Sequence, residues 1–349
     1  MSLPARRMHV QITPAYPPAV SGVGDYAALL ARAASVREGR MRTLVAAEAA
    51  DGAEALRDRS ADALVAALGA ADRVLLHYSG YGYARWALCW WLVEGLRRWK
   101  HGAPDRRLVT LFHEVYATGP IWRTSFWTAR PQRRIVQALA QLTYAGFVTS
   151  QGGYERLRPL RPDLPLEILP VFSNVGEPAE VAQLAGRAAR AVVFGGPVRR
   201  ERAYAAASRN TAALAAGFDR LGVEEIIDIG PGAVAAPSLA GRPVRVLGVL
   251  PPREVSAWLS DARLGLIDYP WHVMTKSGIA AAYFAHGTLA VNTNRLGRLP
   301  DDLVEGQEFV TPQVMRETSD FQEVADAGRA WYAPHGLQET VRRLGLLSG

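Results

Sequence analysis

The sequence has few of the features that mark export, membrane insertion or disulfide chemistry. Its 349 residues include a single cysteine, Cys89, which cannot form a disulfide within the chain. The best apolar run, "WALCWWLV", is far shorter than the roughly twenty residues of a transmembrane helix. The N-terminal segment "MSLPARRMHVQI" has no apolar signal core. We therefore expect a cytoplasmic protein, either soluble or at the inner face of the membrane.

Several common catalytic and metal-binding motifs are also missing. The sequence contains no Cys-x-x-Cys, no His-Glu-x-x-His and no other zinc-ligand spacing. It has no Walker motif, because the run "GGPVRRER" lacks the Gly-Lys-Thr ending, and it has no Gly-x-Ser-x-Gly elbow. We expect no metal ion and no resident cofactor.

Acidic residues are outnumbered by basic ones, 33 to 40, which gives a formal net charge of +7. A basic balance suits phosphate-bearing small molecules, nucleic acid or an anionic membrane surface. The arginines are scattered through amphipathic patterns and form no basic tail, so nucleic acid is the least favoured partner.

Apolar strand-like runs alternate along the chain with helical patterns. The predicted strands cover residues 8–13, 42–47, 73–78, 107–114, 145–150, 190–196, 225–230, 244–250 and 263–270. The predicted helices cover residues 24–36, 61–69, 84–99, 131–142, 203–221 and 252–262, and a further one follows Ser277. This alternation predicts parallel sheets covered on both faces.

The alternation is interrupted once, by "LPVFSNVGEP" at residues 169–178, which is typical of a linker. We predict a first Rossmann-like domain at 1–172, a linker at 173–188, a second at 189–330 and a C-terminal helix at 331–349. Ligands of open α/β sheets bind at the carboxyl ends of the strands. Two such domains are expected to face each other across a cleft.

Three loops of the first half contain candidate ligand groups. Gly22 and Gly24 precede a helix, where free amides favour an anion, although a plain strand–helix turn capped by Asp25 explains them equally well. Gly80 and Gly82 alternate with tyrosines, a pattern that suits a sugar or a base but is explained slightly better by packing.

The third loop begins with His113 and Glu114 at a strand end and holds Trp122, Phe126 and Trp127 beside Arg123. A histidine there can act as acid, base or donor to a hydroxyl, although a lone histidine is more often structural. The aromatic part of the loop could grip an acceptor, rest on a membrane or form a lid.

Two stretches of the second half suit a diphosphate. Arg199, Arg200 and Arg202 follow a strand that ends in two glycines, and a guanidinium can bond two phosphate oxygens at once. A solvated charge cluster is the alternative for these arginines. The segment "MTKSGIAAAYFAHGT" brings Lys276, Ser277 and Gly278 to the start of an alanine-rich helix.

These segments together resemble the GT-B glycosyltransferases, in particular family 4 of the nucleotide-sugar-dependent enzymes. The stretch "AVSGVGDYAALLA" is similar to the family's glycine-rich loop, "LFHE" to its strand ending in a histidine, and "AHGTLAVN" to its Gly-Thr turn. "FGGPVRRER" lies where the family has its Gly-Arg donor loop, and "VRVLGVLPPREVSAWLSDARLGLIDYP" where it has the base-binding turn. The resemblance covers most of the chain.

The resemblance implies a role for each matching residue. Gly22, Gly24, Gly196, Arg199, Arg202, Lys276, Ser277 and Gly278 would bind the donor diphosphate, His113 and Glu114 would be catalytic, and Leu250 and Pro251 would lie in the base-binding region. The family's two glutamates, however, would fall at Met274 and Ala282, so their contacts to sugar and ribose are not supplied here. We infer that Lys276 provides the charge of a lysine that the Gly-Arg loop lacks.

We therefore predict a metal-independent glycosyltransferase that moves a sugar from a nucleotide-diphosphate donor to a glycan or a lipid-linked acceptor, in cell-surface polysaccharide assembly. The resemblance implies that the anomeric configuration is retained. Two alternatives are a non-catalytic protein that binds a nucleotide sugar or glycan, and a nucleotide-sugar epimerase on the same frame. Trp86, Trp90, Trp91 and Trp99 allow peripheral membrane contact, although most of them are expected to be core.

Overall fold

The computed structural model describes residues 9–19, 21–38, 41–48, 51–119, 121–232, 237–300 and 302–345. Met8 of the first predicted strand and residues 346–349 of the predicted C-terminal helix lie outside these ranges. The chain forms two compact units, which we describe separately. Unit 1 comprises residues 1–170 and 337–349, and unit 2 comprises residues 171–336.

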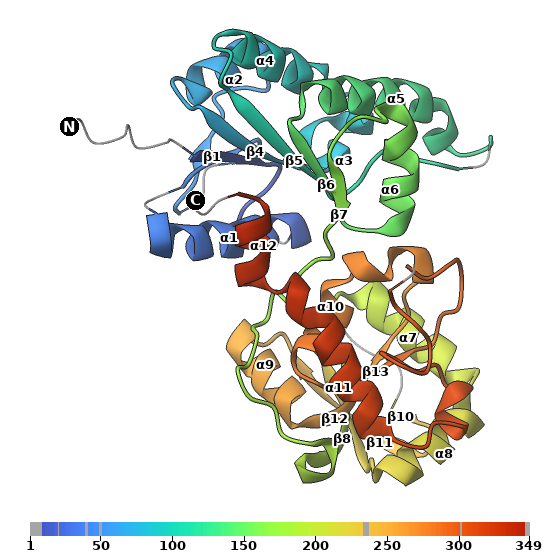
Figure 1. Cartoon of the computed structure of the whole chain (residues 1–349). Coiled ribbons are helices and arrows are strands. Elements are labelled where there is room, and N and C mark those ends of the chain that lie inside the picture. Colours follow the sequence, from blue (N-terminus) through green and yellow to red (C-terminus); the bar gives the residue numbers. More distant parts are fainter. Residues whose placement is uncertain are drawn as a thin grey trace. The chain divides into compact units, whose positions relative to one another are not determined.

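The described residues of unit 1 form a seven-stranded parallel sheet in the order β3-β2-β1-β4-β5-β6-β7 (Figure 1). Its strands are β1 His9–Thr13, β2 Arg42–Val45, β3 Glu54–Ala55, β4 Arg73–Tyr78, β5 Arg107–Phe112, β6 Ala145–Val148 and β7 Leu166–Ile168. Its helices are α1 Gly22–Glu38, α2 Ala61–Leu68, α3 Gly80–Tyr83, α4 Trp90–His101, α5 Thr124–Leu142, α6 Gln151–Leu157 and α12 Leu337–Arg343.

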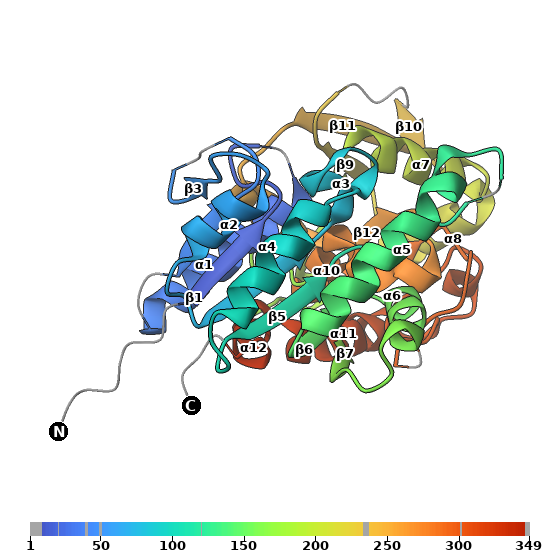
Figure 2. The ribbon, with the colours of Figure 1, turned by 90° about the horizontal axis from the view of Figure 1, so that it is seen from above.

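Helices cover both faces of this sheet, as a buried parallel sheet requires. Figure 2 shows α2, α4 and α5 side by side over one face, and Figure 1 shows α1 next to α12 on the other. The strand order reverses between β1 and β4, which pair in parallel although they are not consecutive. Ligands of such sheets bind outside the carboxyl ends of the strands at this reversal.

The described residues of unit 2 form a six-stranded sheet in the order β10-β11-β9-β8-β12-β13. Its strands are β8 Ala188–Phe194, β9 Glu225–Ile229, β10 Ser238–Leu239, β11 Arg242–Gly248, β12 Ala262–Ile267 and β13 Leu289–Asn292. Its helices are α7 Pro197–Ser208, α8 Thr211–Leu221, α9 Pro252–Asp261, α10 Gly278–Ala285 and α11 Phe321–Tyr332. β10 pairs with β11 in the antiparallel sense, whereas the other pairings are parallel. The order reverses between β8 and β12.

The alanine-rich helix α10 lies directly on the sheet. A Cβ at Gly265 of β12 would come within 2.3 Å of the Tyr283 ring, so the missing side chain of Gly265 makes room for that ring. The Tyr283 hydroxyl donates to the Val192 and Leu266 carbonyls at 3.1 and 3.2 Å. The close approach at this point comes from Gly265 of the sheet, and the alanines of α10 are buried as well.

Three predicted helices have different bounds. The helix predicted at 203–221 is two helices, because the Asn210 amide bonds the Ala206 carbonyl at 2.9 Å at the end of α7 and α8 starts immediately afterwards. The predicted helix 84–99 begins only at Trp90, since Trp86 and Ala87 have φ values of 63° and 59°.

The third, predicted at 131–142, begins at Thr124 and continues through Pro131. Proline removes one backbone donor from the helix, and the surrounding hydrogen bonds tolerate that loss.

The predicted domain limits also differ from the compact units. Residues 173–188 are part of unit 2, where the Ser173 amide donates to the Tyr332 hydroxyl at 2.7 Å and the Leu184 amide to the Gln322 side chain at 2.6 Å. The limit predicted after residue 330 falls inside α11. The final helix α12 packs on α1 of unit 1, and Arg343 pairs with Glu167 at 2.8 Å. Contacts with residues distant in the chain decide which unit residues 173–188 and α12 join.

Candidate functional site

The strand reversal of unit 2 is bordered by a glycine pair after β8. Gly195 has a φ of +128°, which favours glycine, and a Cβ there would come within 2.6 Å of the Ile279 side chain. Gly196 is the N-cap residue of α7, and a Cβ added to it would meet no atom within 4 Å. Gly195 is therefore required by the fold, whereas Gly196 faces open space.

The contact of Gly195 with Ile279 also brings two helix N-termini together. Ile279 is in the first turn of α10, and Gly195 directly precedes the start of α7. Ser277 is the N-cap of α10, where its side chain accepts the Ala280 amide hydrogen at 3.2 Å. First-turn amides and the positive ends of two helix dipoles thus meet at the carboxyl edge of the sheet, an arrangement that favours a bound anion.

Arg199 points toward this strand reversal. Its guanidinium lies 4.1 Å from the ring centroid of Tyr269, which follows β12. Stacking on an aromatic face positions a guanidinium while leaving its N–H groups directed outward in the plane. Arg202 is exposed one turn further along α7.

Arg200 has a structural role and does not fit the predicted cluster of three phosphate-binding arginines. Its side chain is 1% exposed and forms an ion pair with Asp228 of β9. Its guanidinium also donates to the Gly195 carbonyl at 3.0 Å and to the Pro231 carbonyl. The three arginines lie on a helix, where successive residues point about 100° apart, so only some can face one ligand.

The predicted residues at the start of α10 differ in burial. Lys276 is half-buried at the end of the 3₁₀ turn Trp271–Lys276 (η4), and Ser277 is buried. A Cβ on Gly278 would approach the Asn174 side-chain oxygen to 3.4 Å, which is an ordinary contact. The fold alone therefore does not require glycine at position 278.

The positions of the two missing family glutamates are buried. Met274 is 1% exposed, with its sulfur 3.6 Å from the Asn292 amide nitrogen, and Ala282 is 0% exposed on the face of α10 that packs on the sheet. Carboxylates would be desolvated at either position, so this packing is incompatible with simply restoring them.

Sequence reasoning missed a carboxylate near these positions, Asp268 directly after β12. It accepts hydrogen bonds from Thr293 at 3.2 Å and from Asn294 at 3.1 Å and is half-buried. Its place at the carboxyl end of a predicted strand was the signal that could have identified it. Leu250 and Pro251 lie at the same edge of the sheet, between the end of β11 and the start of α9, with Pro251 exposed.

The strand reversal of unit 1 contains a buried chain of polar side chains. Gln11 of β1, His77 of β4 and His113 after β5 lie in sequence across three adjacent strands. His77 Nε2 is 3.1 Å from Gln11 Oε1, and His77 Nδ1 is 3.2 Å from His113 Nε2. Tyr26 of α1 packs edge-on against both rings. His113, the predicted catalytic histidine, is thus held by neighbours from two elements, β4 and α1.

The direction of the hydrogen bonds between Gln11, His77 and His113 follows from the orientation of the Gln11 amide. The Gln11 amide nitrogen donates to the Ala27 carbonyl at 3.1 Å and to Thr43 Oγ1 at 2.8 Å, so its oxygen faces His77 as an acceptor. Burial lowers the pKa of His77 to about 3, so its ring is neutral. His77 must then carry its proton on Nε2, and its Nδ1 accepts from His113 Nε2–H. The structure therefore assigns the Nε2–H tautomer to both histidines when they are neutral.

The other predicted residues of unit 1 have mixed roles. Glu114 is exposed and accepts a hydrogen bond from the Ser79 hydroxyl at 3.1 Å. Gly22 is exposed with nothing within 4 Å of a Cβ, whereas a Cβ on Gly24 would lie 3.0–3.2 Å from the backbone of Ala15 and Tyr16. Ser21, and not Asp25, caps α1, since its hydroxyl oxygen accepts from the Gly24 amide at 3.2 Å.

The glycines of the second loop, Gly80 and Gly82, have a packing role. A Cβ on Gly80 would lie 2.7 Å from Ala87, and one on Gly82 would lie 2.4 Å from Pro14. Among the four tryptophans of this region, Trp99 is buried and Trp91 packs on the core, but Trp86 and Trp90 are exposed. Within the described ranges no group of three or more His, Cys, Asp or Glu side chains is arranged to hold a metal ion.

Known structures share this architecture. The chain is similar to a putative UDP-N-acetylglucosamine 2-epimerase from Listeria monocytogenes, at a TM-score of 0.60, 12% identity, and coverage of 97% of this chain and 95% of that chain. It is similar to HepE of Anabaena in complex with UDP and glucose, at a TM-score of 0.60, 11% identity, and coverage of 97% and 98%. For a glycosyltransferase from Rickettsia africae the TM-score is 0.60, at 10% identity and 97% coverage of both chains.

No family model matches the chain, and no curated protein matches it in sequence. At 10–12% identity the structural likeness shows the fold. The chain has the GT-B fold of glycosyltransferases, with two Rossmann-like units, and the predicted fold class is confirmed. Membership of family 4 stays a prediction.

Proposed function

We propose that the protein is a glycosyltransferase whose unit 2 binds the diphosphate of a nucleotide-sugar donor at the β8–β12 reversal. The observation that carries the proposal is the meeting of the α7 and α10 N-termini at Gly195, next to Arg199. Both helix starts favour an anion, and the HepE structure of the same fold is described as a complex with UDP and glucose.

Arg199, Arg202 and Lys276 would neutralise the diphosphate as the bond to the sugar breaks. The amide of Gly278 would add a hydrogen bond from the helix end, whereas the Ser277 amide, which was predicted to do the same, already donates to the Met274 carbonyl at 2.9 Å. Stabilising the departing charge is the main electrostatic task of this reaction, and fixed cations in a dry site can perform it. We therefore propose a metal-independent transfer that retains the anomeric configuration.

The proposed catalytic group of unit 1 is His113. Its Nε2 is held by His77, which fixes the orientation of the ring, and the ring would bond a hydroxyl of the transferred sugar. The proposed acceptor is a glycan or a lipid-linked precursor of a cell-surface polysaccharide.

A calorimetric titration with UDP, GDP and ADP tests the donor site. Lys276→Ala should weaken the preferred nucleoside diphosphate by about the free energy of one charge-assisted hydrogen bond, roughly 1.5–3 kcal/mol or about ten- to a hundredfold in Kd. Arg199→Ala should do the same. Arg220→Ala, on α8, is the control and should leave Kd unchanged. Equal affinity of Lys276→Ala and the unaltered protein would mean that the start of α10 only packs.

Two alternatives use the same binding site. The buried Met274 and Ala282 favour a protein that binds a nucleotide sugar without turnover, and the fold shared with a putative epimerase favours epimerisation. Incubation with a panel of donor sugars, with and without acceptors, separates the three. Binding without any product supports the first alternative, and an isomerised donor without acceptor supports the second.

A further inference from the structure

Exposed aromatic and basic side chains gather at the N-terminal end of α5. We call this group the α5 surface; it consists of Ile121, Trp122, Arg123, Phe126, Trp127, Arg130, Arg133 and Arg134, all exposed. Trp122 and Trp127 are 81% and 68% exposed, which is unusual for the largest apolar side chain. In both Figure 1 and Figure 2 this end of α5 projects beyond α4 and the strands of unit 1.

Hydrogen bonds hold the α5 surface in place. The buried Gln132 accepts from the Ala117 amide at 2.7 Å and donates to the Trp86 carbonyl at 2.9 Å. The Trp127 indole N–H donates to the Ile121 carbonyl at 3.1 Å. The aromatic rings are therefore presented by an ordered turn that is tied to neighbouring elements.

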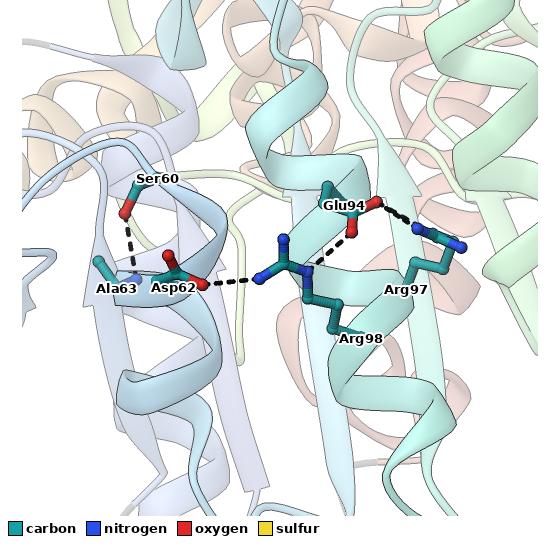
Figure 3. A network of polar contacts seen from close by, with 6 residues as sticks. All are labelled: Ser60, Asp62, Ala63, Glu94, Arg97 and Arg98. Carbon is teal, nitrogen blue, oxygen red and sulfur yellow. Dashed lines mark hydrogen bonds and ion pairs between the residues drawn. The ribbon is translucent and has the colours of Figure 1, made fainter.

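The segment that carries this surface has charge of one sign. Residues 115–154 contain four arginines and no acidic residue. Among the described residues, Arg130, Arg133 and Arg134 form no ion pair. Arg97 and Arg98 on α4 contrast with them, because Glu94 pairs with both and Asp62 also pairs with Arg98 (Figure 3). The arginines of α4 are thus neutralised by carboxylates, whereas the positive charge of Arg130, Arg133 and Arg134 is not compensated.

The backbone adds to this positive potential. The first turn of α5, a helix of 19 residues, contains no acidic residue, and its N-cap residue Arg123 makes no side-chain capping bond. The positive end of the helix dipole therefore coincides with the arginines and favours phosphate groups.

Three of the four arginines follow the aromatic rings along α5, whereas Arg123 lies between Trp122 and Phe126. Arg130 and Arg134 follow Phe126 by one and two turns, or about 6 and 12 Å along the axis. Aromatic anchors of peripheral proteins enter a bilayer by about 5–10 Å. Rings at that depth would place these guanidinium groups at the level of the lipid phosphates.

The exposed Tyr81 and Trp86, which precede α4, extend the apolar area of the α5 surface, and Trp86 does so in an unfavourable backbone conformation. Trp86 is exposed and adopts a left-handed φ of 63°, which is unfavourable for a residue with a side chain. Its carbonyl is bonded to Gln132 of α5, and Tyr81, also exposed, bonds the same amide at 3.2 Å. A strained backbone that keeps a tryptophan in water is a further sign of a surface with a partner.

We propose that the α5 surface docks unit 1 on an anionic lipid bilayer. Trp122, Phe126 and Trp127 enter the interface, and Arg130, Arg133 and Arg134 contact lipid phosphates. A neutral glycan or a second copy of the chain would not require uncompensated arginines. The inference goes beyond the proposed function, since docking needs no nucleotide, and it would bring His113, at the start of the same loop, to an acceptor carried by lipid.

Sedimentation with vesicles tests the proposal. The whole chain is mixed with vesicles of phosphatidylcholine, with or without about 30% phosphatidylglycerol, at low and high salt. We expect binding to the anionic vesicles that weakens with salt. Trp122→Ala/Trp127→Ala should lose most of the binding and the fluorescence quenching by brominated lipids. Arg133→Gln/Arg134→Gln should lower the partition coefficient roughly twentyfold, since each arginine near such a surface contributes about fivefold.

The matched control is Arg97→Gln/Arg98→Gln, which removes the same charge from an adjacent, exposed arginine pair of the same unit. It should change the partition coefficient less than threefold. Equal loss in both arginine double variants would mean that net charge alone attracts the protein, and it would overturn the proposal. So would equal binding to neutral and anionic vesicles, or self-association through the tryptophans without vesicle binding. Nucleotide affinity, measured in parallel, reports separately on the proposed function.

Discussion

At the scale of single residues, the glycines of this chain have different reasons to be glycine. The sequence presents Gly195 and Gly196 as one pair, and the structure separates them. Gly195 combines a left-handed φ with a close neighbour, so its absence of a side chain serves the fold. Gly196 has neither constraint, so its small size is available to a ligand.

This difference predicts opposite outcomes for two alanine substitutions. Gly195→Ala should destabilise unit 2 by more than about 1 kcal/mol, because the backbone is strained and Ile279 is displaced. Gly196→Ala should leave stability within about 0.5 kcal/mol but weaken nucleoside diphosphate binding, because the methyl group occupies the phosphate approach. Urea denaturation and calorimetry measure the two effects. Unchanged diphosphate binding by Gly196→Ala would remove Gly196 from the site.

At the scale of elements, the chain Gln11–His77–His113 links three strands of unit 1. Sequence analysis identified His113 but missed its partners, because Gln11 and His77 are ordinary positions in apolar strands. The parallel register of β1, β4 and β5 brings them together. In the proposed mechanism Gln11 and His77 would be positioning residues, which act through His113.

The tautomers of this chain can be measured directly. Nitrogen NMR of the ring atoms at neutral pH should show a proton on Nε2 of both His77 and His113. Gln11→Leu removes the acceptor that fixes the first ring, so His77 should become a mixture of tautomers and the His113 signals should shift. Gln132→Leu, in the same unit but away from the rings, is the control. A proton on Nδ1 of His77 in the unaltered protein would contradict the assignment.

Two helices begin at residues other than those that the local sequence pattern predicts. The helix predicted at 84–99 has suitable residues throughout, but left-handed residues at 86 and 87 delay it to Trp90. The helix predicted from Pro131 starts earlier, at Thr124, because a proline inside a helix can be tolerated. Both departures lie next to Gln132, whose amide donates to the Trp86 carbonyl at 2.9 Å and to the Thr128 hydroxyl at 3.1 Å, contacts that the local pattern does not show.

At the scale of the molecule, each unit contains a buried neutral histidine. Burial lowers the pKa of His77 in unit 1 to about 3 and that of His286 in unit 2 to about 4. The His286 ring donates to the Ala282 carbonyl at 2.7 Å and lies 2.8 Å from the Ser256 hydroxyl, which must donate to it. In both cases burial is the main cause of the lowered pKa, because it disfavours the charged ring.

Both units should therefore lose stability in mild acid. The unfolded chain binds protons at these histidines below about pH 6.5, whereas the folded chain does so only near pH 3–4, so stability falls as the pH falls between these values. Each unit of pKa difference corresponds to about 1.4 kcal/mol, so the effect amounts to several kcal/mol. Urea denaturation at pH 5 and pH 7.5 measures it. His77→Gln and His286→Gln should each flatten the pH dependence of one unit, and a slope unchanged in both would refute the explanation.

Among the residues that the structure describes, no helix combines the length and apolar character needed to cross a bilayer. The sequence prediction on this point rested only on the short length of the apolar runs. The α5 surface is the proposed place of membrane contact on its own observations.

The sequence by itself determined the alternation of strands and helices and therefore the two α/β units, because hydrophobic periodicity is a local property. It also placed Gly196, Arg199, Lys276 and His113 at strand ends, where parallel sheets bind ligands. Tertiary structure alone decided that Arg200 is buried with Asp228, that Arg199 stacks on Tyr269, that His77 orients His113, and that α12 belongs to unit 1. These are contacts between residues distant in the chain, and they depend on strand order, register and helix rotation, which no local pattern encodes.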